Sequence, residues 1–307
     1  MFYLVTGGAG FIGSNLSEKL LNMGHKVRII DDLSTGREEN IKGFFSDIEF
    51  VNGDIRDLQT VKKAAQGVDY ILHQAALPSV PRSVANPIET NNANIEGTLN
   101  VLVAARDEGV KRVVLASSSS VYGNNEALPK IETMVTKPLS PYAITKHAGE
   151  LYANVFYDIY GLETVSLRYF NIFGPKQDPN SQYAAVIPQF ITAMLRDESP
   201  VIYGDGEQSR DFTYIDNAAE ANILAAVSSE AGHGEVVNIA CGKRLSLNQL
   251  VDMINAILGK DIKPVYAEGR KGDVKHSLAD ISFAKSLLGY KVKVNVEEGL
   301  QKLLDAA

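Results

Sequence analysis

The fold of this chain can be read outward from residues 2–13, FYLVTGGAGFIG. The first five residues are mostly aromatic, aliphatic or β-branched and predict a strand, whereas the apolar spacing after the glycines predicts a helix. Gly7, Gly10 and Gly13 remove side chains where the backbone must turn, approach a ligand and pack the helix against the strand. Free N–H groups at such a helix start attract an anion, typically a pyrophosphate. We therefore expect a phosphate-binding turn close to the first residue.

Composition excludes several classes of protein. The 307 residues are 45% hydrophobic, enough for a sizeable core in one large or two modest domains. A net charge of −7 without a basic tract argues against nucleic acid or an anionic membrane as partner. No apolar run approaches the ~18 residues that span a bilayer, and the chain enters its first strand without a charged leader. The single Cys241 and the unpaired spacing of the five histidines indicate a cytoplasmic protein with no metal and no disulfide.

Strand and helix patterns alternate through the first half of the chain. We predict strands at residues 27–31, 49–51, 70–73, 112–116 and 164–167, and helices at 58–65, 94–108 and 141–160. Ser140 and Pro141 suit the start of the last of these helices, as N-cap and first helical residue. This alternation indicates an α/β fold with a doubly wound parallel sheet and right-handed crossovers.

After residue 173 the pattern of predicted strands and helices changes. Strand patterns become scarce and loops more common, with helices expected at 186–196, 247–258 and 296–306. A segment near 236–240 reads as a strand that returns to the sheet. We predict a nucleotide-binding Rossmann domain at residues 1–173 and a smaller mixed substrate domain at residues 174–307.

Acidic residues at the end of the second predicted strand point to the cofactor. A carboxylate from Asp31 or Asp32 would accept hydrogen bonds from an adenosine ribose diol and repel a 2′-phosphate, which favours NAD over NADP. This spacing also weighs against a glycine-rich turn that holds no ligand, although Arg37 nearby complicates the preference. After the next two strands, the pair at residues 54–55 suits the adenine, and Ala75 lets the cofactor pass close to the backbone. Ordinary loop packing explains these later residues equally well.

The chemistry is expected from serines and a tyrosine–lysine pair. The fifth predicted strand runs into four serines, residues 117–120, at the sheet edge where α/β folds bind ligands. A turn or helix cap accounts for one of these hydroxyls but hardly for all. Tyr142 and Lys146 are four residues apart and share a helix face. A tyrosine titrates near ~10, and a neighbouring ammonium is expected to lower its pKa and make it a base for an alcohol proton. An exposed pair on a surface helix is the other interpretation, and the neighbouring cofactor site weighs against it.

The glycine turn, the serines and Tyr142-x-x-x-Lys146 together resemble the extended short-chain dehydrogenases/reductases, over essentially the whole chain. Within that family the chain is most similar to UDP-sugar 4-epimerases, through LSPY at 139–142, RYFNIFGP at 168–175 and RDFTY at 210–214. The resemblance implies NAD-dependent 4-epimerisation of UDP-hexoses through a 4-keto intermediate. It makes Tyr142 the base, places Lys146 on the nicotinamide ribose and Ser118 on the sugar O4, with Ser119 as the fallback. Related dehydratases carry Thr-Asp-Glu where this chain has serines. This chain therefore lacks the carboxyl acid that a dehydratase needs to expel a hydroxyl as water.

The resemblance also implies two sets of contacts. The expected cofactor contacts are Gly7, Gly10, Phe11, Ile12, Gly13, Asp31, Asp32, Asp54, Ile55, Ala75, Tyr142 and Lys146. The expected substrate contacts are Ser79, Ser118, Ser119, Tyr142, Asn171, Val186, Tyr203, Arg210, Arg270, Asp273 and Ser277. Within the second set, the two arginines would grip the diphosphate and Tyr203 would lie against uracil, although a surface ion pair is the commoner role of an arginine. Ser277 is small where epimerases of plain hexoses tend to be bulky, which leaves room for an N-acetyl group.

The preferred substrates are therefore UDP-GlcNAc and UDP-GalNAc, with UDP-Glc and UDP-Gal as further candidates. Segments 79–83 and 179–185 also resemble the branch that acts on N-acetylated UDP-hexosamines. A UDP-glucuronate 4-epimerase or decarboxylase would share nearly every motif, and a simple alcohol dehydrogenase or an NAD-binding module without catalysis are further alternatives. The predicted helices at 94–108 and 141–160 resemble the pair that forms a four-helix homodimer interface in this family, although they could simply cover the sheet.

Overall fold

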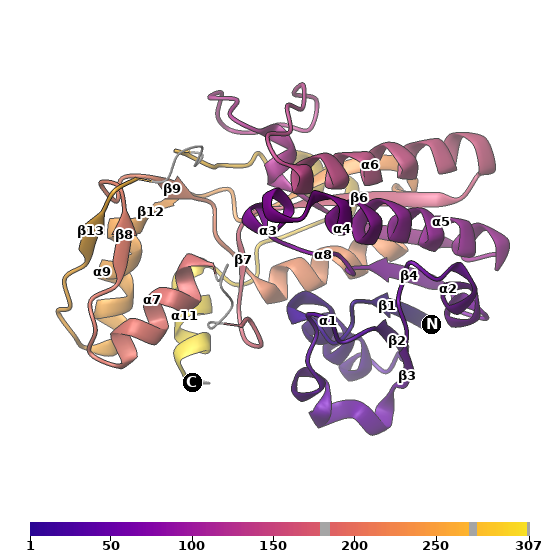
Figure 1. The fold of residues 1–307 in the computed structure, drawn as a ribbon, viewed down its shortest axis with the longest axis horizontal. Helices are drawn as coiled ribbons and strands as arrows, with labels where there is room; N and C mark the ends of the chain where they lie inside the picture. Colours follow the sequence, from indigo (N-terminus) through magenta and orange to yellow (C-terminus); the bar gives the residue numbers. More distant parts are fainter. Residues whose placement is uncertain (179–184, 270–274, 306–307) are drawn as a thin grey trace.

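A seven-stranded sheet lies at the centre of the computed structural model, which describes residues 1–178, 185–269 and 275–305 (Figure 1). Its strand order is β11-β6-β5-β4-β1-β2-β3, and every neighbouring pair is parallel. The strands are β1 Phe2–Thr6, β2 Lys26–Asp31, β3 Glu49–Asn52, β4 Tyr70–His73, β5 Arg112–Ser118, β6 Glu163–Tyr169 and β11 His233–Ile239. The predicted α/β fold with a doubly wound parallel sheet is confirmed.

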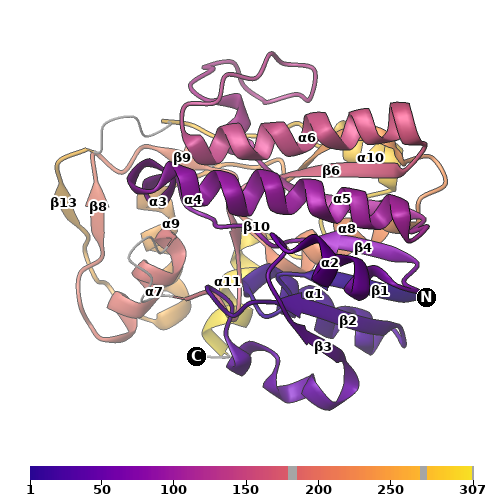
Figure 2. The same ribbon diagram turned by 45° about the vertical axis from the view of Figure 1, so that its right-hand side comes forward.

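Helices cover both faces of this sheet. In β1 the side chains of Tyr3 and Val5 join one apolar cluster and that of Leu4 joins another, because successive strand residues point to opposite faces. The first cluster packs under α1 (Phe11–Asn22), α8 (Ile215–Val227) and α10 (Ser282–Leu288). The second packs under α2 (Leu58–Ala65), α5 (Gly97–Asp107) and α6 (Pro141–Tyr160), and Figure 2 shows α5 and α6 side by side.

The start of α6 follows the sequence prediction. Ser140 is the N-cap, and its hydroxyl accepts a hydrogen bond from the backbone N–H of Ala143, with Pro141 in the first turn. The helix ends at Gly161, which adopts the left-handed conformation with φ 67°. This local chemistry fixes where the helix begins and therefore where its first turn, which carries Tyr142, meets the sheet.

The predicted helix at 94–108 begins differently in the structure. Short helices α3 (Val80–Ala85) and α4 (Pro87–Asn91) lead into a π-helical turn, Asn92–Glu96, and regular α5 starts only at Gly97. Asn94 within the wide turn is buried, and its side chain bonds the backbone of Leu77 and the hydroxyl of Thr145. These contacts to distant residues accompany the wide turn. The sequence around residue 94 does not predict them.

The second half of the chain builds a smaller group of elements beside the sheet (Figures 1 and 2). A third apolar cluster gathers residues of α7, α9 and α11. The helices of this group are α7 Val186–Leu195, α9 Leu247–Leu258 and α11 Val296–Asp305. Its strands form three pairs: β7 Ile172–Phe173 with β10 Thr213–Tyr214, β8 Val201–Tyr203 with β13 Val265–Ala267, and β9 Ser209–Arg210 with β12 Leu245–Ser246. The remaining elements are the 3₁₀ helices Glu38–Asn40, Lys42–Asp47 and Ser119–Tyr122.

The strand expected near 236–240 does return to the sheet, because β11 pairs with β6 at its edge. The later half of the chain also supplies α8 and α10, which pack on the same sheet. The predicted division at residue 173 stays a prediction.

Candidate active site

A cavity of about 690 Å³ opens at the carboxyl ends of the central strands. This is the edge at which open α/β sheets bind ligands. The cavity wall contains all the residues that the sequence predicts as cofactor contacts: Gly7, Gly10, Phe11, Ile12, Gly13, Asp31, Asp32, Asp54, Ile55, Ala75, Tyr142 and Lys146. It also contains residues that sequence reasoning missed, namely Gln74, Tyr169, Lys176, Gln177 and Asp178.

The glycine turn between β1 and α1 leaves no room for side chains. Gly7 has φ 66°, and a Cβ on it would lie 2.7 Å from the Cα of Ala75. A Cβ on Gly13 would lie 2.2 Å from the carbonyl oxygen of Gly7. Any side chain at this position would therefore push α1 away from the turn. Gly10 is the N-cap of α1 and offers no side-chain acceptor to the first turn. The N–H groups there are thus available to an anion in the cavity.

Asp31 ends β2 with its carboxylate in the cavity wall. It accepts hydrogen bonds from the backbone N–H groups of Ala9 and Leu33, each 2.9 Å long, and burial raises its pKa. Arg37 lies in the same wall, but its guanidinium pairs with Asp178 over 2.5 Å. The Arg37 guanidinium, which complicates the preference for NAD over NADP, is therefore paired with the carboxylate of Asp178.

Tyr142 and Lys146 line the same cavity. The Lys146 ammonium is 5.9 Å from the centre of the Tyr142 ring and donates a 2.8 Å hydrogen bond to the carbonyl of Ala116. Burial lowers the pKa of Lys146 to about 8.

The expectation that Lys146 lowers the pKa of Tyr142 is wrong for this structure, which contains no ligand. Burial raises the pKa of Tyr142, and a hydrogen bond with the Ser118 side chain opposes that rise only in part. The desolvation of the phenolate outweighs its stabilisation, and a sequence does not reveal how deeply a side chain is enclosed.

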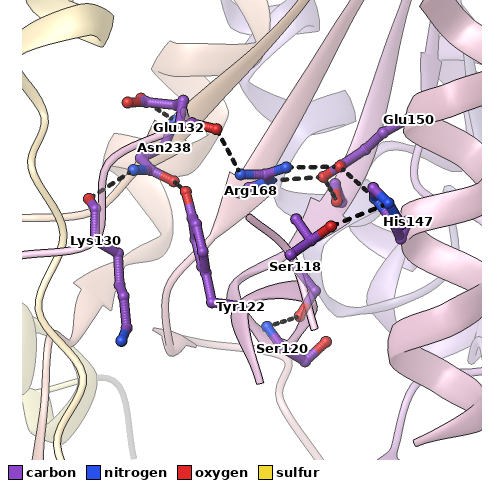
Figure 3. A network of polar contacts seen from close by, with 11 residues as sticks. Ser118, Ser120, Tyr122, Lys130, Glu132, His147, Glu150, Arg168 and Asn238 are labelled. Atoms are coloured by element: carbon purple, nitrogen blue, oxygen red, sulfur yellow. Dashed lines mark hydrogen bonds and ion pairs between the residues drawn. The ribbon is translucent and has the colours of Figure 1, made fainter. Parts of the chain in front are cut away.

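The serine run takes four different environments. The Ser117 hydroxyl donates to Glu150, whereas the Ser118 hydroxyl lies beside Tyr142. The Ser118 hydroxyl also accepts a 3.2 Å hydrogen bond from the N–H of Ser120 (Figure 3). Ser119 opens the 3₁₀ turn that follows β5. The Ser120 hydroxyl is buried and has no hydrogen-bond partner among the described residues. The first two serines are thus tied to α6.

Several predicted substrate residues gather around β9. The Asn171 amide donates to the carbonyl of Asp211 over 3.1 Å, beside Arg210. The Arg210 guanidinium in turn donates to the carbonyl of Lys275 over 3.2 Å, and the Ser277 N–H donates to the carbonyl of Ser209 over 2.9 Å. The structure therefore brings Asn171, Arg210 and the segment that carries Ser277 together.

The other predicted substrate residues are more dispersed. Ser79 lines the cavity as N-cap of α3, and its hydroxyl accepts a hydrogen bond from the N–H of Arg82. Val186 opens α7, and Tyr203 ends β8 with its side chain 39% exposed. Arg270 and Asp273 lie outside the described residues. A role for any of these residues in binding the sugar nucleotide stays a prediction.

Two features are absent from the part of the chain that the structure describes. Within it, no three His, Cys, Asp or Glu side chains gather as ligands of one metal ion. No helix within those ranges combines the length and apolar character that crossing a membrane requires.

Comparison with known proteins places this site in a family. A family model described as the NAD dependent epimerase/dehydratase family matches residues 3–240. The chain is 38% identical over 306 residues to the UDP-glucose 4-epimerase of Mycolicibacterium smegmatis, covering 98% of this chain and 97% of that one. It is 36% identical over 314 residues to the UDP-glucuronate 4-epimerase of Thermodesulfobacterium geofontis, covering 99% and 95%.

A solved structure gives the same answer. The UDP-N-acetylglucosamine 4-epimerase of Methanobrevibacter ruminantium M1, in complex with UDP-N-acetylmuramic acid, superposes with a TM-score of 0.94. The identity is 45%, with 99% of this chain and 96% of that chain covered. The chain therefore belongs to the NAD dependent epimerase/dehydratase family, and its homologues include UDP-sugar 4-epimerases. The resemblance to extended short-chain dehydrogenases/reductases is confirmed.

The residues present fit the NAD of this family. The turn at Gly7 and Gly13 excludes side chains beside the uncapped start of α1, which suits a pyrophosphate. Asp31 presents a carboxylate to the same cavity, where a ribose diol would donate to it.

Proposed function

We propose that this protein catalyses the 4-epimerisation of UDP-hexoses with bound NAD. The observation that carries the proposal is that Tyr142 and Lys146 line the same cavity as the glycine turn, with the side chain of Ser118 beside Tyr142. The names of the homologues support the same reaction. Within the proposal, NAD supplies the means to accept and return two electrons at the sugar's C4.

The chain's own residues handle the proton of the sugar's O4. Tyr142 is the base that takes this proton and later returns it, and Ser118 holds O4 by a hydrogen bond. Lys146 fixes the position of its ammonium through the carbonyl of Ala116 and brings positive charge close to the phenol. Because the side chain of Ser118 lies beside the phenol, both groups are placed to contact one sugar hydroxyl.

The sugar is proposed to be N-acetylated, with UDP-GlcNAc and UDP-GalNAc preferred over UDP-Glc and UDP-Gal. The small side chain of Ser277, on a segment that runs beside Arg210, supports this choice. The 45% identity to a protein named UDP-N-acetylglucosamine 4-epimerase also supports it. In Ser277→Tyr the ratio of N-acetylated to plain hexose turnover is expected to fall, and an unchanged ratio would reject the idea.

The experiment that tests the proposal is a side-by-side assay of the purified protein. UDP-GlcNAc, UDP-Glc and UDP-glucuronate are supplied in turn, and NMR follows inversion at C4 while a coupled assay follows CO₂. The proposal expects inversion of UDP-GlcNAc with no net consumption of added NAD. Stoichiometric reduction of NAD would instead identify an alcohol dehydrogenase, and turnover restricted to UDP-glucuronate would favour the second candidate function, which the relative from Thermodesulfobacterium geofontis suggests.

The protein is further proposed to be a homodimer. The outer face of α6 carries exposed apolar side chains at helical spacing: Ile144, Leu151, Val155 and Ile159. Each of these side chains is more than two-fifths exposed, and such a stripe on one helix supports burial against a second copy. Light scattering of the pure protein tests this proposal.

A further inference from the structure

One buried carboxylate joins three elements beside the proposed catalytic residues. Glu150 lies on α6 and its side chain is only 3% exposed. Arg168 of β6 pairs with it through two hydrogen bonds, from Nε to Oε1 and from Nη2 to Oε2, both 2.8 Å long. The Ser117 hydroxyl of β5 donates to Oε1 over 2.5 Å, and Nδ1 of His147 lies 3.2 Å from Oε2. Figure 3 shows Arg168 between Glu150 and Glu132, whose backbone carbonyl accepts from the same guanidinium.

The carboxylate of Glu150 is ionised in this setting. Burial alone would raise its pKa, but the hydrogen bonds and charge of Arg168, helped by His147 and Ser117, hold the pKa below its usual range. The bond from Ser117 is therefore charge-assisted, and the paired guanidinium fixes the direction in which the carboxylate points. A neutral contact at the same place would hold the strand less firmly.

Three consecutive residues at the end of β5 contact three residues that share one face of α6. The pairs are Ala116 with Lys146, Ser117 with Glu150, and Ser118 with Tyr142. The partners on α6 are spaced by four, so they follow one another along the helix. Along β5, Ser117 lies between the two residues that meet the proposed base and its lysine, whereas along α6 its partner Glu150 comes after both.

We propose that Glu150, acting through Ser117, is a positioning residue that sets the distance between Ser118 and Tyr142. This inference rests on the proposed function, because it concerns the residues given a role there. The three contacts fix the end of β5 against α6, while Arg168, the direct neighbour of Ser117 across the sheet, anchors the carboxylate. Loss of the Ser117–Glu150 contact keeps the bond between Lys146 and Ala116 but frees the next residue, Ser118, to drift from the phenol.

Two variants test the proposal. Ser117→Ala removes the hydroxyl and keeps the buried ion pair, so the protein is expected to fold. Glu150→Gln keeps an oxygen that can accept from Ser117 but removes the charge that orients it. The matched control is Ser166→Ala on β6, which deletes a buried hydroxyl that has no hydrogen-bond partner among the described residues. All are assayed as full-length protein with NAD and the UDP-sugar that the wild type turns over best.

We expect kcat of Ser117→Ala to fall about tenfold to a hundredfold, because small misplacements of reacting groups are costly. The KM for the UDP-sugar and the Kd for NAD should stay within about twofold of wild type, since the Ser117 hydroxyl is directed at Glu150 and Ser117 is not an expected ligand contact. The acid limb of the kcat profile should move to higher pH, because the Ser118 hydrogen bond that lowers the pKa of Tyr142 is weakened. The double variant with Glu150→Gln should be no slower than the slower single variant, since both substitutions weaken the same contact between Ser117 and residue 150.

Contrary outcomes are equally definite. A Ser117→Ala protein with wild-type kcat and pH profile rejects the positioning role, as does an equal loss in Ser166→Ala. A loss that instead tracks a lower Tm and weaker NAD binding assigns the network to folding alone and overturns the proposal. A wild type that inverts no UDP-sugar rejects the proposed function separately. In that case crystal structures still decide the geometry, since Ser118 must move away from Tyr142 in Ser117→Ala.

Discussion

At the scale of single residues, the environment of Tyr142 matters as much as its identity. Its phenol shares one face of α6 with Lys146, yet the lysine donates to the Ala116 carbonyl and burial raises the pKa of the phenol. A base with a raised pKa gains its proton easily and gives it up reluctantly. The Ser118 hydrogen bond is the contact within the described protein that works in the other direction.

Tyr142→Phe removes the hydroxyl that would take the substrate's proton. We expect kcat to fall by about two to four orders of magnitude, which is the usual contribution of a general base. The dissociation constant for UDP should change little, because Arg210, a predicted diphosphate contact, lies on β9 and not on α6. Stopped-flow turnover and calorimetric UDP binding measure the two effects, and wild-type turnover in the variant would remove Tyr142 from the mechanism.

Asp211 makes the stability of the protein depend on pH. Its carboxylate is fully buried and accepts hydrogen bonds from the backbone N–H groups of Cys241, Gly242 and Ala279, yet burial raises its pKa to about 6. The folded pKa lies above the unfolded value of 3.8. The contribution of Asp211 to the free energy of unfolding is thus fully present below that value and is lost as pH rises through about 6.

The expected size of this loss is about 3 kcal/mol, at roughly 1.4 kcal/mol for each unit of pKa shift. Asp211→Asn abolishes the titration, so its free energy of unfolding should fall less than that of wild type between pH 4 and pH 7. Urea unfolding at each pH measures both proteins. Parallel profiles for wild type and variant would show that this carboxyl does not titrate over the range.

At the scale of elements, α6 carries most of the site. Its N-cap at Ser140 sets the first turn, in which Tyr142 lies, and the next two turns supply Lys146 and Glu150. One helix thus presents the proposed base, its lysine and the proposed positioning residue to the end of β5.

Ser140→Ala should therefore affect both stability and turnover. Loss of the hydrogen bond to the Ala143 N–H is expected to cost about 1 kcal/mol in free energy of unfolding. A frayed first turn also loosens Tyr142, so kcat should fall while the KM for the UDP-sugar stays similar. Ser140→Asp restores a capping oxygen and is the control. Equal Cm values in urea for the alanine and aspartate variants would argue against the cap.

The same helix shows which features the sequence predicts and which it does not. The start of α6 and the glycine turn depend on neighbouring residues, so Ser140, Pro141 and the glycine spacing predict them. The carboxylate of Glu150 instead meets Arg168 from another element and Ser117 from a third, and nothing local to α6 indicates either contact. The spacing of four from Lys146 was the available signal, because it places Glu150 on the face that already carries the predicted pair.

The π-helical turn before α5 and the raised pKa of Tyr142 also depend on contacts between elements that are distant in the sequence. Asn94 is held by Leu77 and Thr145, which are distant in sequence, and the shift of Tyr142 depends on how deeply the fold encloses it. Patterns of neighbouring residues predict strands, helices and caps, whereas burial and contacts between elements follow only from the assembled chain.

At the scale of the whole molecule, the proposed dimer predicts that charged substitutions in the apolar stripe on α6 will prevent dimer formation. Leu151→Glu combined with Val155→Glu places two charges where a second copy would bury apolar surface. Light scattering should give a mass near 33.3 kDa for this variant and about twice that for wild type. Val135→Glu, at a position 85% exposed outside α6, is the control and should stay dimeric. A wild type that is already monomeric would reject the proposal.

The strands of the central sheet are not synthesised in the order in which they pair. β6 emerges well before β11, the strand that finally pairs with it, and α8, which covers one sheet face, also comes late. Until then the nascent chain displays uncovered apolar side chains, a feature that promotes aggregation. A growing chain of this protein is therefore expected to need a chaperone until α10, which packs on the same face, has left the exit tunnel.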